Sequence, residues 1–356
     1  MNQLSTITRP SSFAQDVPAP AAELAVARLL GGEDLSQDES SALFLEIVEG
    51  RLPDPLMSAA FVALRLKGET ANELAGAALA LRSAAMAFER PDYLFADSCG
   101  TGGDCSGSIN VSTAAGLVVA ASGLPIVKHG NRSFTSKCGS ADVLEALGAR
   151  LDAPPEASRR ILDQTGFCFL LAPQYHPGIA HAGPVRRALK VRTIMNLLGP
   201  CLNPARPPVQ LLGVADPNLL DPIARTLRAL GVERALVVHG SGLDEIALHG
   251  FTEAVRLADG EIERIEITPE QAGLPRYPLQ AIAGGPPTDN AERLRALLEG
   301  RGGNADRDVV AVNAGALLAT AGVALTVGDG VQMALDAIGS GAALRVLEGF
   351  VEASNG

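Results

Sequence analysis

Apolar positions in the first part of the chain recur at the spacing of an amphipathic helix. Ser36 opens a capping-box pattern that Thr70 repeats, and the segment after Ser36 carries Leu43 and Ile47 on one face. The range 55–67 predicts a second apolar helix. We therefore predict a small helical unit over residues 21–90. Because its apolar faces are many and its core is small, it must pack on the rest of the chain or on a second copy.

From residue 91 onward the pattern changes to short β-like runs that alternate with helices. The β-like runs cover 126–127, 167–171, 209–214 and 235–238, with a hairpin over 254–257 and 262–267. The covering helices are expected over 219–230, 291–298, 308–321 and 331–338. This alternation predicts a mainly parallel sheet with helices on both faces.

The sequence therefore predicts an α/β protein with a small N-terminal helical domain and a large α/β domain. Residues 1–20 lack apolar periodicity and predict a flexible extension. The helical domain is expected over 21–90, and a short segment near 175–200 is a candidate addition to it. The α/β domain is expected over 91–356.

Composition narrows the class of function. The chain has 356 residues, 47% of them hydrophobic, and a formal net charge of −11. That charge opposes binding to a nucleic-acid backbone. No run approaches the roughly 18 apolar residues of a membrane span, and the start of the chain lacks the regions of a signal peptide. The five cysteines are odd in number and form no C-x-x-C pair, so we expect reduced thiols in a cytoplasmic protein without nucleic-acid or membrane partners.

Three donor-rich loops are expected near the start of the α/β domain. The range 99–104 is rich in glycine, 110–113 opens a helix, and 128–133 adds a lysine. Loop N–H groups, a helix N-terminus and a cation are groups that hold phosphate. The G-x-G-x-x-G pattern of a dinucleotide site fails at Cys105, and no P-loop G-K-[ST] occurs. Each loop alone could be an ordinary connection, but together they predict a polyphosphate site.

Two further groups indicate metal and carboxylate chemistry. Asp244 and Glu245 follow the run 235–238, at an end of the sheet where α/β proteins bind ligands. Adjacent carboxylates with the hydroxyl of Ser112 suit Mg²⁺, although such a pair is often only a solvated charge pair on the surface. Arg186 and Arg187 lie on a helix with apolar surroundings, where a guanidinium could clamp a carboxylate.

These residues together resemble the anthranilate phosphoribosyltransferase family over nearly the whole chain. The resemblance rests on motifs in order, namely residues 61–70, 100–104, 110–113, 128–132, 192–200, 203–204, 243–245 and 313–315. It implies the nucleoside phosphorylase and phosphoribosyltransferase type of fold, with a homodimer formed through the helical domains. The implied substrates are anthranilate and 5-phosphoribosyl 1-pyrophosphate (PRPP), and the implied products are N-(5-phosphoribosyl)anthranilate and pyrophosphate, in tryptophan biosynthesis.

The resemblance also implies site residues. PRPP would be held by Gly100, Gly103, Asp104, Ser108, Asn110, Val111, Ser112, Thr113, Lys128, His129, Gly130, Asn131, Arg132, Ser133, Phe134, Thr135, Ser136 and Ser140. Anthranilate would meet Gly100, His129, Asn131, His176, Arg186 and Pro200. Two Mg²⁺ ions per subunit would be bound by Ser112, Asp244 and Glu245. The residues expected to carry the chemistry are Lys128, Arg186, Asp244 and Glu245.

Three positions depart from the family pattern. Cys105 stands where a further glycine is usual, Cys138 where serine is common, and Met195 where phenylalanine is common. None of these removes a proposed charged ligand, so they affect the fit and mobility of the loops. Two alternatives share the architecture: a pyrimidine nucleoside phosphorylase, and a non-catalytic nucleic-acid binder, which the net charge of −11 opposes.

Overall fold

The computed structural model describes residues 20–133 and 137–356. The extension expected over residues 1–20 lies outside the described part except for its last residue. Three of the expected PRPP ligands, Phe134, Thr135 and Ser136, also lie outside it.

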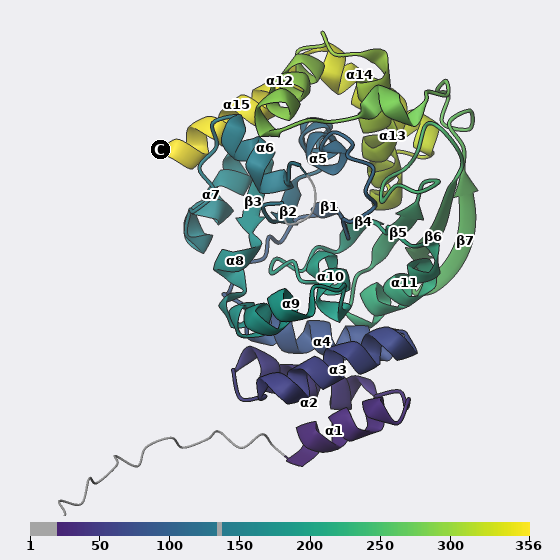
Figure 1. The fold of residues 1–356 in the computed structure, drawn as a ribbon. Helices are drawn as coiled ribbons and strands as arrows, with labels where there is room; N and C mark the ends of the chain where they lie inside the picture. The colour runs from purple at the N-terminus through teal and green to yellow at the C-terminus, as the bar shows by residue number, and fades with distance from the viewer. Residues whose placement is uncertain (1–19, 134–136) are drawn as a thin grey trace, which may run out of the picture.

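The N-terminal helices form a small bundle below the main body of the molecule (Figure 1). They are α1 (Pro20–Leu30), α2 (Gln37–Val48), α3 (Asp54–Lys67) and α4 (Ala71–Ser83). The predicted capping boxes are present, because Ser36 accepts from the N–H of Glu39 and Thr70 from that of Glu73. The expected helical unit is therefore confirmed, and α3 begins one residue before the predicted start.

The main body is built on one sheet of seven strands in the order β3-β2-β1-β4-β5-β6-β7. The strands are β1 (Ala96–Gly100), β2 (Ile126–Gly130), β3 (Phe167–Leu171), β4 (Val209–Gly213), β5 (Arg234–His239), β6 (Thr252–Ala258) and β7 (Glu261–Ile267). The first five run parallel, and β6 and β7 add an antiparallel hairpin. This confirms the predicted mainly parallel sheet and the hairpin at its rim.

Two of the expected loops begin inside strands. Cys99 and Gly100 were expected in a loop but form the end of β1, and the range 128–130 belongs to β2. The sequence misleads here because both strands carry polar residues near their ends, which breaks the apolar run. The ladder continues regardless, since Gly100 pairs with Gly213 and Gly130 with Leu171.

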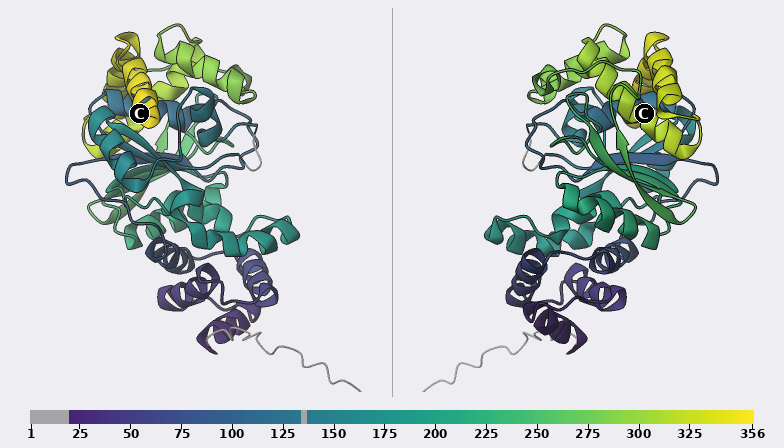
Figure 2. Two further views of the ribbon diagram at one scale, coloured as in Figure 1. Left: turned by 90° about the vertical axis from the view of Figure 1, so that its left-hand side faces the viewer. Right: turned by 90° about the vertical axis from the view of Figure 1, so that its right-hand side faces the viewer.

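Helices cover both faces of the sheet (Figure 2). One face holds α5 (Val111–Ala121), α6 (Ser140–Ala146), α7 (Pro155–Thr165), α12 (Pro287–Leu298), α13 (Asn304–Ala321), α14 (Val327–Gly339) and α15 (Ala342–Asn355). The other side holds α9 (Gly183–Leu189), α10 (Ile194–Leu198) and α11 (Leu220–Ala229), with short 3-10 turns η1 (Pro177–Ala182), η2 (Gly199–Cys201) and η3 (Pro217–Leu219). The short helix α8 (Ala172–Tyr175) and the turn η4 (Leu279–Ile282) pack with the first group, because Tyr175 and Ile282 belong to its buried cluster. The predicted covering helices are all present, and α7 and α15 are among those that the pattern did not predict.

The helical bundle shares one continuous hydrophobic core with the underside of the sheet. Phe44 and Phe61 of the bundle belong to the same buried cluster as Leu198 of α10 and Val237 of β5. Burial of these faces removes apolar surface from water. The bundle therefore packs on the larger part of this chain, which was one of the two expected solutions. Among the described residues, no helix is both long and apolar enough to cross a bilayer.

Candidate active site

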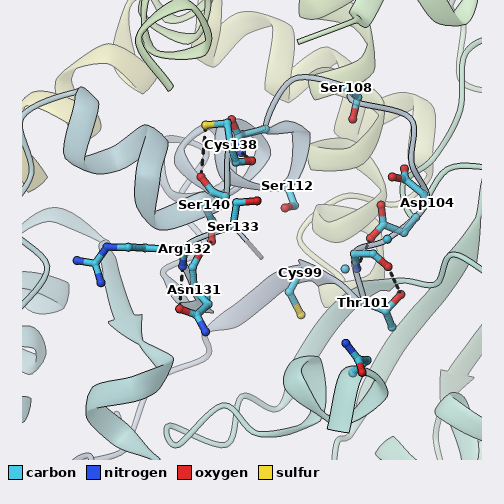
Figure 3. Close-up of a pocket in the computed structure, with 18 of the residues that line it drawn as sticks. Cys99, Thr101, Asp104, Ser108, Ser112, Asn131, Arg132, Ser133, Cys138 and Ser140 are labelled. Carbon is cyan, nitrogen blue, oxygen red and sulfur yellow. Dashed lines mark hydrogen bonds between the residues drawn. The ribbon is translucent and has the colours of Figure 1, made fainter. Parts of the chain in front are cut away.

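A cavity of about 670 Å³ opens where the parallel strands end. Figure 3 shows Asp104 on one side of this space, Asn131 on the other and Ser112 between them. The lining residues are Cys99–Asp104, Ser106–Thr113, Lys128–Ser133, Cys138–Ser140, Arg186, Arg187, Lys190–Arg192, Asn196, Asp244 and Glu245. Three distant parts of the sequence thus meet at the carboxyl ends of the strands, which is the usual ligand position in α/β sheets.

Lys128 supplies a buried cation on the cavity floor. Its side chain is 1% exposed, and its Nζ donates to the carbonyl of Ser98 and to Ser112 Oγ, the latter at 3.2 Å. Asp97 lies nearby on β1, fully buried, and burial raises the pKa of its carboxyl to about 6 although Lys128 opposes this shift. Asn203 Nδ2 donates to Asp97 Oδ2 at 2.9 Å. The Lys128 ammonium is therefore held at the base of the cavity by its bonds to Ser98 and Ser112.

Asp244 and Glu245 approach the glycine loop and the start of α5. Asp244 Oδ2 accepts from the N–H of Gly102 at 2.7 Å, and Glu245 Oε1 accepts from the N–H of Ser112 at 3.0 Å. Burial raises the pKa of both carboxyls, and repulsion from a neighbouring carboxylate raises it further in each case. A Cβ on Gly213 would lie 1.6 Å from the Asp244 carbonyl oxygen, so only glycine permits this approach.

The donor set at Asp244, Glu245 and Ser112 fits a hard divalent cation. Two carboxylates with raised pKa are stabilised in their charged form by a cation, and a hydroxyl lies within the same cavity. Within residues 20–133 and 137–356, no three His, Cys, Asp or Glu side chains form a metal-binding group. A cation here would therefore complete its shell with water and substrate oxygens, as Mg²⁺ commonly does.

The glycine loop after β1 turns sharply to approach the cavity. Gly102, Gly103 and Cys105 have φ of +68°, +78° and +59°, which lie in the left-handed region. Cys105 adopts this conformation as a non-glycine residue, at the position where the family usually has glycine. Asp104 Oδ1 accepts from the N–H of Ser106 at 3.1 Å and helps to close the turn.

The loop after β2 is held by a helix-capping carboxylate. Asp142 Oδ2 accepts from the N–H groups of Ser133 and Gly139, each at 2.8 Å. Arg132 pairs with Glu145 on α6 rather than with a cavity group. Asn131 Oδ1 accepts from the N–H of Arg132 at 2.8 Å, and Asn131 lines the cavity.

The expected anthranilate residues separate into two groups. Arg186 and His129 line the cavity together with Gly100 and Asn131, and burial lowers the pKa of the Arg186 guanidinium. His176 and Pro200 do not reach the cavity lining. His176 stacks edge-on behind His129 with ring centroids 5.2 Å apart, and its Nε2 is 2.9 Å from the Leu202 carbonyl oxygen.

Several cavity residues were not among the expected ligands. Lys190 and Arg192 line the cavity together with Arg186 and Arg187, and Arg192 Nη2 donates to the Gly102 carbonyl at 2.6 Å. A signal for them was present, because the range 186–192 concentrates four basic residues in an acidic chain. Asn196 and the thiols of Cys99 and Cys138 also line the cavity.

The fold and the site together define a two-domain glycosyl transferase. Residues 24–85 match the family model described as the helical bundle domain of a glycosyl transferase family, and residues 92–344 match the model of its a/b domain.

Individual relatives narrow this class. The chain is 57% identical over 326 residues to anthranilate phosphoribosyltransferase of Sorangium cellulosum, covering 92% of this chain and 94% of the relative. It is 48% identical over 334 residues to the enzyme of that name from Pseudoalteromonas translucida, covering 94% of each chain. The chain therefore belongs to the anthranilate phosphoribosyltransferase family.

Solved structures agree with this assignment. The crystal structure of anthranilate phosphoribosyltransferase from Thermus thermophilus matches with a TM-score of 0.89 and 41% identity, over 93% of this chain and 99% of that one. The Saccharomyces cerevisiae enzyme in complex with PRPP and Mg matches with a TM-score of 0.86 and 27% identity, over 95% and 99% of the two chains. A further structure of the yeast enzyme is a complex with 4-fluoroanthranilate.

Proposed function

We propose that this chain transfers the phosphoribosyl group of PRPP to the amine of anthranilate in tryptophan biosynthesis. The observation that carries the proposal is a single cavity with two chemically different sides. One side has loop N–H groups, a helix start and buried Lys128, and the other has Arg186. The side with Lys128 and the N–H groups suits a pyrophosphate ester, and the side with Arg186 suits an acceptor that carries a carboxylate.

The PRPP side would be formed by the loops after β1 and β2 and the N-terminus of α5. The proposed ligands that line the cavity are Gly100, Gly103, Asp104, Ser108, Asn110–Thr113, Lys128–Ser133 and Ser140. Their N–H and hydroxyl groups are donors, and a helix N-terminus favours an anion.

Asp244, Glu245 and Ser112 would hold Mg²⁺, with two ions per subunit as the proposed number. The yeast relative solved with PRPP and Mg supports the choice of metal. A metal held by these side chains would supply positive charge that offsets the charge on the leaving pyrophosphate.

Arg186 would orient the anthranilate carboxylate, with Asn131, Gly100 and His129 around it. The yeast relative in complex with 4-fluoroanthranilate supports an aromatic acceptor in this family. A guanidinium and a carboxylate form a strong paired hydrogen bond when water is excluded, and Arg186 is partly buried. His176 and Pro200 lie behind the residues that line the cavity. We propose that they contact the acceptor when it binds deeper than this lining.

The reaction forms a C–N bond at ribose C1 and breaks the C–O bond to pyrophosphate. The electron pair of the broken bond leaves with pyrophosphate, and the amine loses one proton as its nitrogen becomes neutral again. Lys128 and the loop N–H groups would stabilise the charge that grows on the leaving group. Because an aromatic amine is already neutral at pH 7, positioning by Arg186 can replace activation by a base.

We also propose a homodimer through the helical domain, in the cytoplasm. Three leucines on the bundle are strongly exposed, Leu24 and Leu30 of α1 at 63% and 65% and Leu66 of α3 at 82%. Exposed apolar side chains of this size favour a covered surface. Light scattering after size exclusion tests this, and a monomer mass across the micromolar range would contradict it.

One experiment tests the activity directly. The fluorescence of anthranilate should disappear only when the enzyme, PRPP and Mg²⁺ are all present, with pyrophosphate released in equal amount. Unchanged fluorescence under these conditions would refute the proposal. Release of a free base from a pyrimidine nucleoside and inorganic phosphate would instead identify a nucleoside phosphorylase.

A further inference from the structure

Asn110 stands at the entrance of α5 but does not cap that helix. An asparagine at this position normally accepts an N–H of the first turn, yet no side-chain cap is formed. The residue instead forms the centre of an inverse γ-turn, with φ of −76° and ψ of 70°, and Val111 N donates to the Ile109 carbonyl at 2.8 Å. The Asn110 side chain therefore occupies none of the N–H groups in the first turn of α5, where Val111 N–H bonds to Ile109 and Ser112 N–H to Glu245.

The side chain of Asn110 is held by groups on two other segments. Asn290 Nδ2 donates to Asn110 Oδ1 at 3.0 Å. Asn110 Nδ2 donates to the carbonyl of Cys138 at 3.2 Å, and the Cys138 thiol lies 3.3 Å from Asn110 Oδ1. Asn110 thus links the second donor-rich loop to Cys138, which precedes α6, and Asn290 holds the Asn110 side chain from α12.

Asn290 lies outside the cavity and is rigidly supported. It is 2% exposed, in the first turn of α12, and is absent from the cavity lining. Its Oδ1 accepts from the N–H of Gly285 at 2.8 Å.

The segment before α12 also binds the loop that leads into α5. Ile109 N donates to the Ile282 carbonyl at 2.9 Å, and Gly284 N donates to the Gly107 carbonyl at 2.6 Å. The loop and Asn290 are therefore fixed to the same segment, which gives Asn290 a defined position relative to Asn110.

We propose that Asn290 is a positioning residue for PRPP. By holding the Asn110 side chain against the carbonyl of Cys138, it keeps that side chain away from the first turn of α5 and sets the spacing between this turn and the segment of Cys138. This inference rests on the proposed function and extends it to a residue that touches no substrate. Without Asn290, the Asn110 side chain is released to compete for the same N–H groups that the phosphate uses.

The test compares Asn290→Leu, which has similar size and no polar atoms, with wild type and with Glu292→Gln. Glu292 is an exposed residue of the same helix and serves as the matched control. We expect KM for PRPP to rise about 5- to 10-fold in Asn290→Leu, the scale of one lost buried hydrogen bond, while KM for anthranilate and the control variant stay near wild type. Asn290→Ser repeats the measurement with a smaller change if the leucine variant does not fold.

A double-mutant cycle separates positioning from general support. In an Asn110→Ala background the side chain that Asn290 holds is gone, so Asn290→Leu should raise KM for PRPP by less than about 2-fold further. An unchanged effect of Asn290→Leu in that background, or equal rises in both KM values, overturns the proposal. If wild type itself fails to consume anthranilate with PRPP and Mg²⁺, the proposed function fails instead, so the two outcomes are distinct.

Discussion

The Arg192 guanidinium lies directly against the glycine loop at Gly102 and Gly103. A Cβ on Gly103 would lie 1.5 Å from Arg192 Nη2, so Gly103→Ala must displace the guanidinium. The displacement also breaks the 2.6 Å hydrogen bond from Arg192 to the Gly102 carbonyl. The two residues should therefore act as one unit when the loop binds PRPP.

The size of the effect follows from two costs. Placing alanine at φ of +78° costs about 1–2 kcal/mol. Losing the exposed, charge-assisted hydrogen bond costs about 1 kcal/mol, the low end for such bonds because water screens it. Gly103→Ala should thus lose about 2–3 kcal/mol, or about 30- to 150-fold in kcat/KM for PRPP. Arg192→Ala alone should lose about 1 kcal/mol, about 5-fold.

The double variant Gly103→Ala with Arg192→Ala tests whether the two residues act as one unit. With Arg192 removed, alanine at position 103 costs only its backbone strain, so the double variant should be as active as Gly103→Ala alone. The assay is the initial rate of anthranilate fluorescence loss against PRPP concentration at saturating anthranilate and Mg²⁺. Multiplied losses, with the double variant about 5-fold below Gly103→Ala, would refute the coupling.

Gly102→Ala is the matched control. Gly102 has a similar φ of +68°, but a Cβ there meets nothing within 4 Å. The loss of kcat/KM in Gly102→Ala should come from backbone strain alone. It should multiply with the loss in Arg192→Ala, because no guanidinium is displaced.

Three further outcomes are expected. Arg186→Ala should raise KM for anthranilate at least about 10-fold more than KM for PRPP, since only the acceptor carries a carboxylate to pair with the guanidinium; equal rises measured in the same assay would exclude that role. Asp244→Asn with Glu245→Gln should weaken the dependence of rate on Mg²⁺, and an unchanged metal titration would remove the metal site. Burial, with His176 nearby, lowers the pKa of His129 to about 3, so His129 is neutral when folded. The stabilisation that comes from neutral His129 is fully present above the pKa of the unfolded residue, about 6.5. As the pH drops from that value toward 3, the free energy of unfolding falls by about 1.4 kcal/mol per pH unit. Urea unfolding at pH 7 and 5.5 should show less loss for His129→Gln than for wild type, and equal losses would contradict this origin.

Much of the fold follows from periodicity in the sequence. The capping box at Ser36 and the alternation of short β-like runs with helices predicted the bundle and the parallel sheet. The additional helix α15 also carries a readable pattern, because Ala343, Leu347 and Phe350 are buried at helical spacing. Strand ends were harder, since Asp97 and Lys128 are polar and yet lie within buried strands.

The site was predictable where it depends on residue type and less so where it depends on backbone contacts. The loops expected to bind phosphate and the pair Asp244 and Glu245 do line one cavity, and donors and carboxylates indicate their chemistry by residue type alone; their ligands stay a prediction. Arg192 acts on a main-chain carbonyl, and Asn290 acts through Asn110 from 180 residues away. The basic residues of the range 186–192 mark Arg192 as a candidate, but its partner carbonyl and the partner of Asn290 are revealed only by the tertiary structure.

The charges in the cavity make anion binding depend on the cation. Asp104, Asp244 and Glu245 face the same space as the phosphate loops, in a chain with a formal net charge of −11. In their charged form these carboxylates would repel a pyrophosphate and so oppose the attraction of Lys128 and of the basic residues in the range 186–192. A divalent cation held by Asp244 and Glu245 would offset this repulsion and supply positive charge for the phosphate oxygens. PRPP affinity should therefore fall much more steeply on Mg²⁺ removal than anthranilate affinity, because Arg186 offers the acceptor a cation that needs no metal.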